Sequence, residues 1–259
     1  MTPPRDLSDF TPTALVTGAT AGIGLEFARQ LSARGDHLVL VARDSARLES
    51  VAEELRRGGS TVETIRADLT VPEQLALVEA RLADPERRVD LLVNNAGFGL
   101  KKRFLDNPIA DEVAMLDVLV TAVLRLSHAA LGPMGERGRG GIINVSSVAA
   151  FLPRGTYSAA KAWVNSFSEW AATEYRTQGV TITALCPGFT KTEFHQRMDV
   201  KRGDGPLWLD AEFLVRTALA DHAKGKVFSI PSARYKAIVA VSRAVPTSVL
   251  QKFQSMGRR

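Results

Sequence analysis

Short apolar runs alternate with amphipathic segments along most of the chain. The runs are continuously apolar rather than alternating, which is typical of strands covered on both faces of a parallel sheet. Between them, segments such as residues 24–33 and 45–57 carry apolar residues at a period of 3.6, which predicts helices. The predicted strands are residues 14–17, 37–42, 61–66, 91–94, 141–145 and 180–185. This order predicts repeated units of strand, helix and parallel strand.

Six strands with intervening helices predict an α/β fold, a doubly wound parallel sheet of the Rossmann type in three αβα layers. After residue 187 the alternation weakens, with a helix expected near residues 210–220 and a short strand near residues 227–230. We find no internal repeat, so we predict a single domain. Its predicted parts are a loose arm at residues 1–12, the α/β domain at 13–231 with a mobile segment at 189–209, and a helical tail at 232–259. A Gly/Arg-rich turn is expected at residues 132–141.

The composition fits a globular protein with one large core. The chain has 259 residues, of which 45% are hydrophobic and 24% charged, and this excludes collagen, coiled coil and disorder. We expect no signal peptide and no membrane span, because no run approaches about 18 apolar residues. Cys186 is the single cysteine, so an intramolecular disulfide and a thiolate metal cluster are excluded. We therefore expect a cytoplasmic protein that holds no metal.

The net charge of +5 is concentrated at the C-terminal end. No acidic residue follows Asp221, whereas eight Lys and Arg residues do, so the first 221 residues carry 25 basic and 28 acidic groups. Because the basic end lacks interleaved aromatic residues and a recognised reader motif, we do not expect a nucleic-acid partner. Pro246 can begin a basic helix with one apolar face. We expect this face to pack on its own domain; the alternatives are an anionic membrane or a partner subunit. The apolar residues of this face are Val249, Leu250, Phe253 and Met256.

A glycine-rich turn follows the first predicted strand and precedes the first predicted helix. Gly18, Gly22 and Gly24 would let the backbone approach a pyrophosphate without a clash from Cβ. The helix N-terminus adds free N–H groups and the positive end of its dipole, which favour bound phosphate. Three glycines alone are weak evidence, but their placement between a strand and a helix predicts a dinucleotide site.

The end of the second predicted strand indicates which dinucleotide binds. NAD sites place a carboxylate here for the ribose 2′-hydroxyl, whereas this chain has Ala42 followed by Arg43. A guanidinium can hold a 2′-phosphate with two charge-assisted hydrogen bonds. We therefore predict NADP (NADPH) as the cofactor. The alternative is that Arg43 is a solvated arginine and that Asp44 serves the ribose.

Several motifs together resemble the short-chain dehydrogenase/reductase (SDR) family over residues 13–192. Besides the glycine turn, residues 94–97 match the family's Asn-Asn-Ala-Gly motif, and residues 157–161 match its Tyr-x-x-x-Lys motif after the serine segment at 144–147. Asp68 matches its adenine-binding aspartate. The resemblance implies an NADP(H)-dependent oxidoreductase that interconverts a carbonyl and an alcohol. The cofactor contacts implied or predicted are Gly18, Thr20, Gly22, Ile23, Gly24, Arg43, Asp68, Leu69, Asn94, Ala96, Gly97, Tyr157, Lys161, Pro187, Gly188, Thr190 and Thr192.

Tyr157 and Lys161 are four residues apart, which places them on one face of a predicted helix. A phenol with a pKa of about 10 is a poor proton relay at neutral pH. We therefore expect the neighbouring ammonium to favour the phenolate and lower the pKa of Tyr157. The resemblance implies that Ser147 hydrogen-bonds the substrate oxygen, that Tyr157 donates a proton in reduction, and that Lys161 also holds the nicotinamide ribose.

Two features depart from the family pattern. Leu119 stands where the family has a catalytic Asn, so the proton route from the lysine is expected to be altered, through Thr121 or backbone carbonyls, or catalysis to be weakened. Ser147 and Tyr157 are only ten positions apart, closer than in most relatives, which predicts a trimmed wall of the substrate pocket. The short spacing leaves Ser146 as the alternative serine.

By resemblance, residues 189–209 form a lid over the substrate. An apolar or aromatic carbonyl compound is the expected small-molecule substrate, and His195 is more often a surface residue than a second acid or base. The candidate lining residues are Phe98, Phe151, Phe194, His195, Met198 and Trp208. The resemblance also implies a homo-oligomer, a dimer or tetramer, through the helices at residues 116–130 and 160–175.

Two alternative functions stay open at this point. The first is a nucleotide-binding regulatory or scaffold protein with impaired catalysis, which the missing Asn favours and the retained Ser, Tyr and Lys disfavour. The second is a membrane-surface reductase of lipid-like ketones, which only the basic tail supports.

Overall fold

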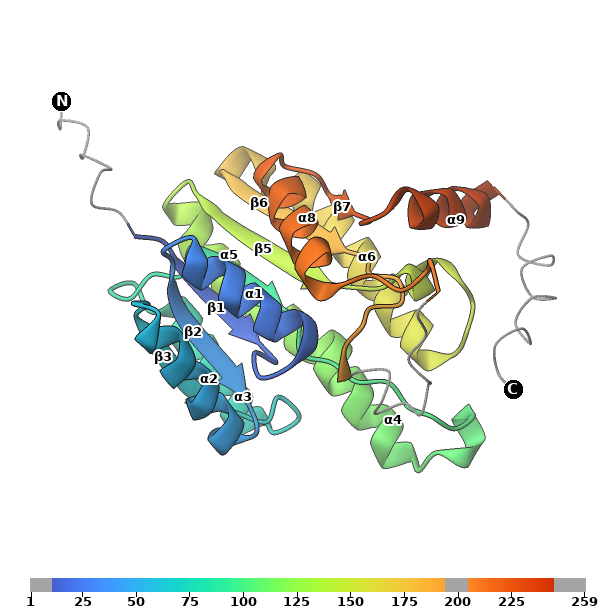
Figure 1. Ribbon diagram of the computed structural model, residues 1–259, viewed down its shortest axis with the longest axis horizontal. Coiled ribbons are helices and arrows are strands. Elements are labelled where there is room, and N and C mark those ends of the chain that lie inside the picture. The colour runs from blue at the N-terminus through green and yellow to red at the C-terminus, as the bar shows by residue number, and fades with distance from the viewer. Residues whose placement is uncertain (1–10, 194–204, 245–259) are drawn as a thin grey trace.

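A parallel β-sheet with a helical layer on each face forms the body of the computed structural model, which describes residues 11–193 and 205–244 (Figure 1). The strands are β1 Thr13–Thr17, β2 His37–Ala42, β3 Val62–Arg66, β4 Leu91–Asn94, β5 Gly140–Val145, β6 Val180–Leu185 and β7 Phe228–Ser229. Their order is β3-β2-β1-β4-β5-β6-β7, and all the pairs are parallel. The predicted doubly wound sheet is confirmed. The strand order reverses between β1 and β4, which is where ligands bind in such sheets.

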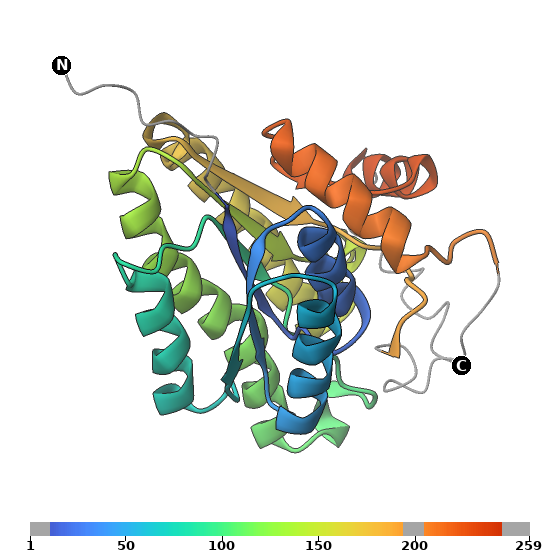
Figure 2. The same ribbon diagram turned by 60° about the vertical axis from the view of Figure 1, so that its left-hand side comes forward.

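The helices divide between the two faces of the sheet. Figure 2 shows α1, α2 and α8 on one side and α3 and α5 on the other, where α6 also packs. The eight α-helices of the described residues are α1 Gly22–Ala33, α2 Ser45–Arg57, α3 Pro72–Ala83, α4 Ile109–Leu116, α5 Ala122–Glu136, α6 Thr156–Glu174, α8 Ala211–Ala223 and α9 Ala233–Ala244. Successive residues of β1 point to opposite faces of the sheet: Val16 packs with α1, and Leu15 packs with α3 and α5.

The turn expected at residues 132–141 is shorter than predicted. Helix α5 continues through Gly132 and Pro133 to Glu136, and β5 begins at Gly140. Met134 explains the continuation, because its side chain is buried and lies against Gly140. Burial of a side chain of this size stabilises the fold by about 1.5–3 kcal/mol, which outweighs the weak helix propensity of glycine.

The run from Ile109 to Glu136 contains α4, a π-helical turn (Asp117–Thr121) and α5. By length and composition alone it could cross a membrane, because 18 residues within it reach a mean hydropathy of 1.6. Its α5 part packs on the sheet with Leu126, Ala130 and Met134 buried. These contacts are those of a core helix.

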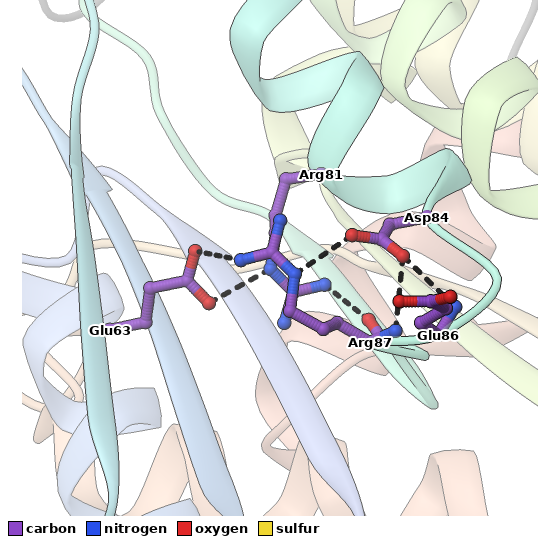
Figure 3. A network of polar contacts seen from close by, with 5 residues as sticks. All are labelled: Glu63, Arg81, Asp84, Glu86 and Arg87. Atoms are coloured by element: carbon purple, nitrogen blue, oxygen red, sulfur yellow. Dashed lines mark hydrogen bonds and ion pairs between the residues drawn. The ribbon is translucent and has the colours of Figure 1, made fainter.

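A groove of about 630 Å³ lies between the edge strand β3 and α3, away from the glycine turn. Its charged side chains neutralise one another (Figure 3). Glu63 accepts from Arg81 at 2.8 Å and lies 3.5 Å from Arg87, which in turn pairs with Asp84 at 2.8 Å. We therefore place no functional site in this groove.

Candidate active site

The glycine turn between β1 and α1 has a backbone that needs glycine. Gly18 and Gly22 have φ of +66° and +56°, which side chains disfavour. A Cβ on Gly24 would lie 2.3 Å from the Gly18 carbonyl oxygen, and one on Gly22 would lie 3.1 Å from Cβ of Thr192. No side chain within the described residues caps the start of α1 at Ala21, so the first N–H groups of the helix can take an anion. The turn therefore fits a dinucleotide pyrophosphate.

Asn95 holds this turn against the end of β4. Its Nδ2 donates to the carbonyl oxygens of Thr17 (2.8 Å) and Gly18 (3.2 Å), and its N–H donates to the Thr17 hydroxyl (3.0 Å). By contrast, Asn94 donates into the sheet to Asn144 (2.9 Å), so its side chain is withdrawn from the predicted cofactor contacts. Asn95 was not among the predicted site residues, although its place in the Asn-Asn-Ala-Gly motif was a signal.

Arg43 and Asp68 lie together at the ends of β2 and β3. Arg43 Nη1 is 3.6 Å from Asp68 Oδ2, and the Arg43 side chain is 65% exposed. Burial opposes ionisation of Asp68, but hydrogen bonds from Thr70 and the charge of Arg43 outweigh it and hold the pKa of Asp68 below its usual value. Asp44 accepts from the Arg47 N–H (3.0 Å) as the N-cap of α2. This capping role disfavours the alternative in which Asp44 serves a ribose.

Ser147 and Ser146, which follow β5, face different neighbours. The Ser147 side chain hydrogen-bonds the Tyr157 side chain, and its Oγ also accepts from the Ala149 N–H at 3.1 Å. Ser146 is buried and donates to the backbone carbonyl of Lys161 (3.1 Å). Of the two serines, Ser147 is therefore the one placed to act with Tyr157.

Tyr157 and Lys161 lie on the same face of α6. Lys161 Nζ is 5.8 Å from the centre of the Tyr157 ring and donates to the Val145 carbonyl at 2.6 Å. Burial raises the pKa of Tyr157 to about 12, although its hydrogen bond with Ser147 acts in the opposite direction. The expectation of a lowered tyrosine pKa is therefore wrong for this structure, because desolvation dominates. Burial lowers the pKa of Lys161 to about 8, against the opposing effect of Cys186.

Leu119 stands where the resemblance places the family's Asn. Its side chain is fully buried in the π-helical turn, and it packs with Met115, Ala160 and the Tyr157 ring. Its Cδ2 also lies 2.8 Å from where a Cβ on Gly97 would stand. The Asn is thus replaced by an apolar wall behind the tyrosine. Two alternative proton routes from Lys161 were expected, one through Thr121 and one through backbone carbonyls. Thr121 is exposed to solvent, whereas a backbone carbonyl does contact Lys161.

Helix α6 is positioned at its start by a buried carboxylate. Glu112 of α4 is 4% exposed and accepts from the Thr156 hydroxyl at 2.6 Å and from Asn107 Nδ2 at 2.9 Å. Because Thr156 directly precedes Tyr157, this contact fixes the tyrosine relative to the neighbouring helix. Glu112 was not predicted as a site residue, since a glutamate early in a helix is usually exposed.

The segment after β6 brings the predicted nicotinamide-side residues to the glycine turn. The Val148 N–H donates to the Pro187 carbonyl (2.9 Å), and Thr190 donates to the Gly188 carbonyl (3.1 Å). Thr192 lies against Gly22. Cys186 is fully buried at the start of this segment, as expected. The other predicted contacts are also described: Thr20 and Ile23 in the turn, and Leu69 and Ala96 packed in the core beside it.

Three of the residues predicted to line the substrate pocket are described by the structure: Phe98, Phe151 and Trp208. Phe98 packs with the cluster of Leu119 and Tyr157. The Trp208 ring lies 5.4 Å from Phe189, and Phe151 lies 6.4 Å from Phe228. The predictions for Phe194, His195 and Met198, and for the helix from Pro246, fall outside the described residues.

A family model described as short chain dehydrogenase matches residues 12–203. The chain belongs to the short-chain dehydrogenase family. The predicted resemblance is confirmed, and the SDR family is a family of oxidoreductases.

Individual SDR relatives cover most of the chain. A short-chain dehydrogenase from Sphingobium yanoikuyae in complex with NADPH is 34% identical with a TM-score of 0.82, and the match covers 90% of this chain and 94% of that one. The bulky-bulky ketone specific alcohol dehydrogenase from Comamonas testosteroni is 30% identical with a TM-score of 0.79, covering 95% and 96%. Serine 3-dehydrogenase from Rhizobium radiobacter is 35% identical over 70% of this chain and 73% of its own.

Proposed function

We propose that this SDR is an NADP(H)-dependent oxidoreductase that interconverts a carbonyl and an alcohol at a Ser-Tyr-Lys site. One observation carries the proposal: Ser147, Tyr157 and Lys161 meet at the end of β5, next to a glycine turn built for a dinucleotide. The bound cofactor supplies the hydride that is exchanged with the carbonyl carbon.

The residues around the site fit the parts of this cofactor. The turn of Gly18, Gly22 and Gly24 would hold the pyrophosphate, and Arg43 with Asp68 would meet the adenosine end. Lys161 and the segment from Pro187 to Thr192 would meet the nicotinamide end. The NADPH bound to the relative from Sphingobium yanoikuyae supports this assignment.

The side chains of the site supply the proton chemistry. Because the pKa of Tyr157 is raised to about 12, its hydroxyl is protonated at neutral pH and can donate to the oxygen of a carbonyl that is being reduced. Ser147 hydrogen-bonds the same hydroxyl and would share the substrate oxygen as negative charge develops on it. Lys161 is buried beside the tyrosine and would stabilise the phenolate left after donation.

Arg43 provides the test of cofactor choice. We expect Arg43→Ser to raise the KM for NADPH by about 10- to 100-fold, since a charged hydrogen-bonded pair contributes about 1.5–3 kcal/mol, and to leave the KM for NADH within about twofold. Arg57→Ser, an exposed arginine at the other end of α2, is the matched control. A wild-type enzyme that prefers NADH would contradict the proposal.

The substrate class is proposed from aromatic side chains, of which Phe98 packs with Tyr157 and the others lie in the segment proposed to cover the substrate. Phe98, Phe189 and Trp208 favour a carbonyl compound with bulky apolar groups, and the name of the relative from Comamonas testosteroni supports this class. Following NADPH oxidation across aryl ketones, aliphatic aldehydes and keto esters tests it. If the protein binds NADPH but oxidises it with none of them, the regulatory alternative is favoured instead.

We also propose that the enzyme forms a homo-oligomer through α4, α5 and α6. Exposed apolar residues follow one another along the helical run at spacings of four, three and eight, and Trp170 on α6 is 53% exposed. The residues of this stripe on α4 and α5 are Ile109, Val113, Leu116 and Leu124.

Leu124 and Trp170 provide the test of the oligomer. We expect the wild-type chain to sediment as a dimer or tetramer at micromolar concentration. The double variant Leu124→Arg, Trp170→Arg is expected to sediment as a 28.0 kDa monomer, because unpaired charges buried in an interface oppose association. Phe213→Arg, an exposed apolar residue on α8, is the control. A monomeric wild type would overturn this proposal.

A further inference from the structure

Tyr235 of α9 joins two segments that are distant in sequence. Its side chain is 3% exposed, and its hydroxyl accepts from the Phe189 N–H at 2.9 Å while donating to the Leu207 carbonyl at 2.7 Å. Burial raises the pKa of Tyr235, so the hydroxyl keeps its proton for the Leu207 carbonyl at neutral pH. A single hydroxyl thus links the residues after β6 to the residues before α8.

The Tyr235 ring makes a second contact, with the backbone of Gly188. A Cβ on Gly188 would lie 1.9 Å from Cζ of the ring, so the ring covers the glycine with no room for a side chain. Arg234, the preceding residue, donates to the Pro206 carbonyl at 2.6 Å. Helix α9 lies at the β7 edge of the sheet in Figure 1. Its consecutive residues Arg234 and Tyr235 therefore contact both the segment after β6 and the segment before α8.

The two segments are also paired with each other. The Leu209 N–H donates to the Phe189 carbonyl (2.8 Å), and the Lys191 N–H donates back to the Leu209 carbonyl (2.9 Å). One residue further along, Thr192 lies against Gly22 of the glycine turn. The Tyr235 hydroxyl is thus connected, through the backbone hydrogen bonds between the two segments, to Thr192. Thr192 in turn contacts the glycine turn that is proposed to hold the cofactor.

We propose that Tyr235 is a positioning residue that holds residues 188–192 in place for the nicotinamide end of the cofactor. It lies outside the residues matched by the family model, which end at 203. The inference rests on the proposed function, because it assumes that this segment meets the nicotinamide.

Comparing the binding of NADPH with the binding of a fragment that lacks the nicotinamide tests the proposal. Tyr235→Phe keeps the ring against Gly188 and removes only the hydroxyl. We expect the Kd for NADPH to rise about tenfold, as for the loss of one or two net hydrogen bonds. The Kd for 2′-phospho-ADP-ribose, which lacks the nicotinamide, is expected to change less than twofold. Tyr175→Phe at the end of α6 is the matched control and is expected to change neither value.

A second measurement separates this inference from the proposed function. Amide hydrogen exchange of peptides covering residues 186–193, without any cofactor, is expected to be faster in Tyr235→Phe than in wild type, because the Phe189 N–H loses its acceptor. Unchanged exchange overturns the anchoring. An equal rise in the Kd values for NADPH and 2′-phospho-ADP-ribose overturns the nicotinamide-side role and indicates a general loss of structure. A wild type that binds neither ligand overturns the proposed cofactor, and with it this role.

Discussion

Replacing Tyr157 by phenylalanine is expected to lower kcat for carbonyl reduction by about 10²- to 10⁴-fold, the contribution of a positioned proton donor. Phenylalanine retains the ring that packs with Leu119 and Ala160, so the fold and the affinity for NADPH should be preserved. Steady-state kinetics with NADPH and a reactive ketone, together with a fluorescence titration of NADPH, measure the two effects separately.

The control for this variant is Tyr175→Phe, which removes a hydroxyl of the same kind from the end of α6. It should leave kcat within about twofold of wild type. A Tyr157→Phe enzyme that retains more than about a tenth of wild-type kcat would remove the tyrosine from the proton transfer. Loss of NADPH binding in the same variant would instead indicate a structural role.

The parts of the site that were predictable from the sequence are those encoded locally. The glycine turn was predictable because a strand, the conformationally free Gly18 and Gly22, and the start of a helix all lie within a dozen residues. The pairing of Tyr157 with Lys161 follows from helical spacing. The strands were located to within one residue at each end, including β7, whose two residues lie inside the predicted range 227–230.

The parts that were not predictable depend on contacts between distant residues. Tyr235 and Phe189 are 46 positions apart, and nothing near Tyr235 in the sequence indicates that its hydroxyl meets a loop. The choice between Ser146 and Ser147 depends on how the end of β5 packs on α6, which spacing does not determine. The direction of the Tyr157 pKa was mistaken because helical spacing gives proximity to a lysine but not the degree of burial.

Lys161 illustrates how the site is maintained at a cost to the fold. Its folded-state pKa is about 8 against 10.5 for the free side chain, so the unfolded chain binds more protons between those values. Stability therefore rises as the pH increases from about 8 to 10.5, and at pH 7 the full penalty of about 3 kcal/mol for the buried ammonium applies. The hydrogen bond from Nζ to Val145 returns about 1 kcal/mol of this.

Lys161→Met is accordingly expected to lose activity and gain stability. Methionine has similar length without the charge, so the free energy of unfolding at pH 7 should rise by about 1–3 kcal/mol in urea titrations. Reduction should slow by about 10²-fold or more, because the phenolate left by proton donation loses its neighbouring cation. Ala162→Met, on the same helix, is the control for adding methionine.

The pH profile of reduction distinguishes the charge of Lys161 from its shape. In wild type, kcat/KM should fall as the pH rises through about 8, because the ammonium deprotonates there while Tyr157, with its pKa of about 12, keeps its proton. In Lys161→Met the residual activity should be flat across this range. If the variant retains the fall near pH 8, another group titrates in the site, and the role given to the lysine charge is incorrect.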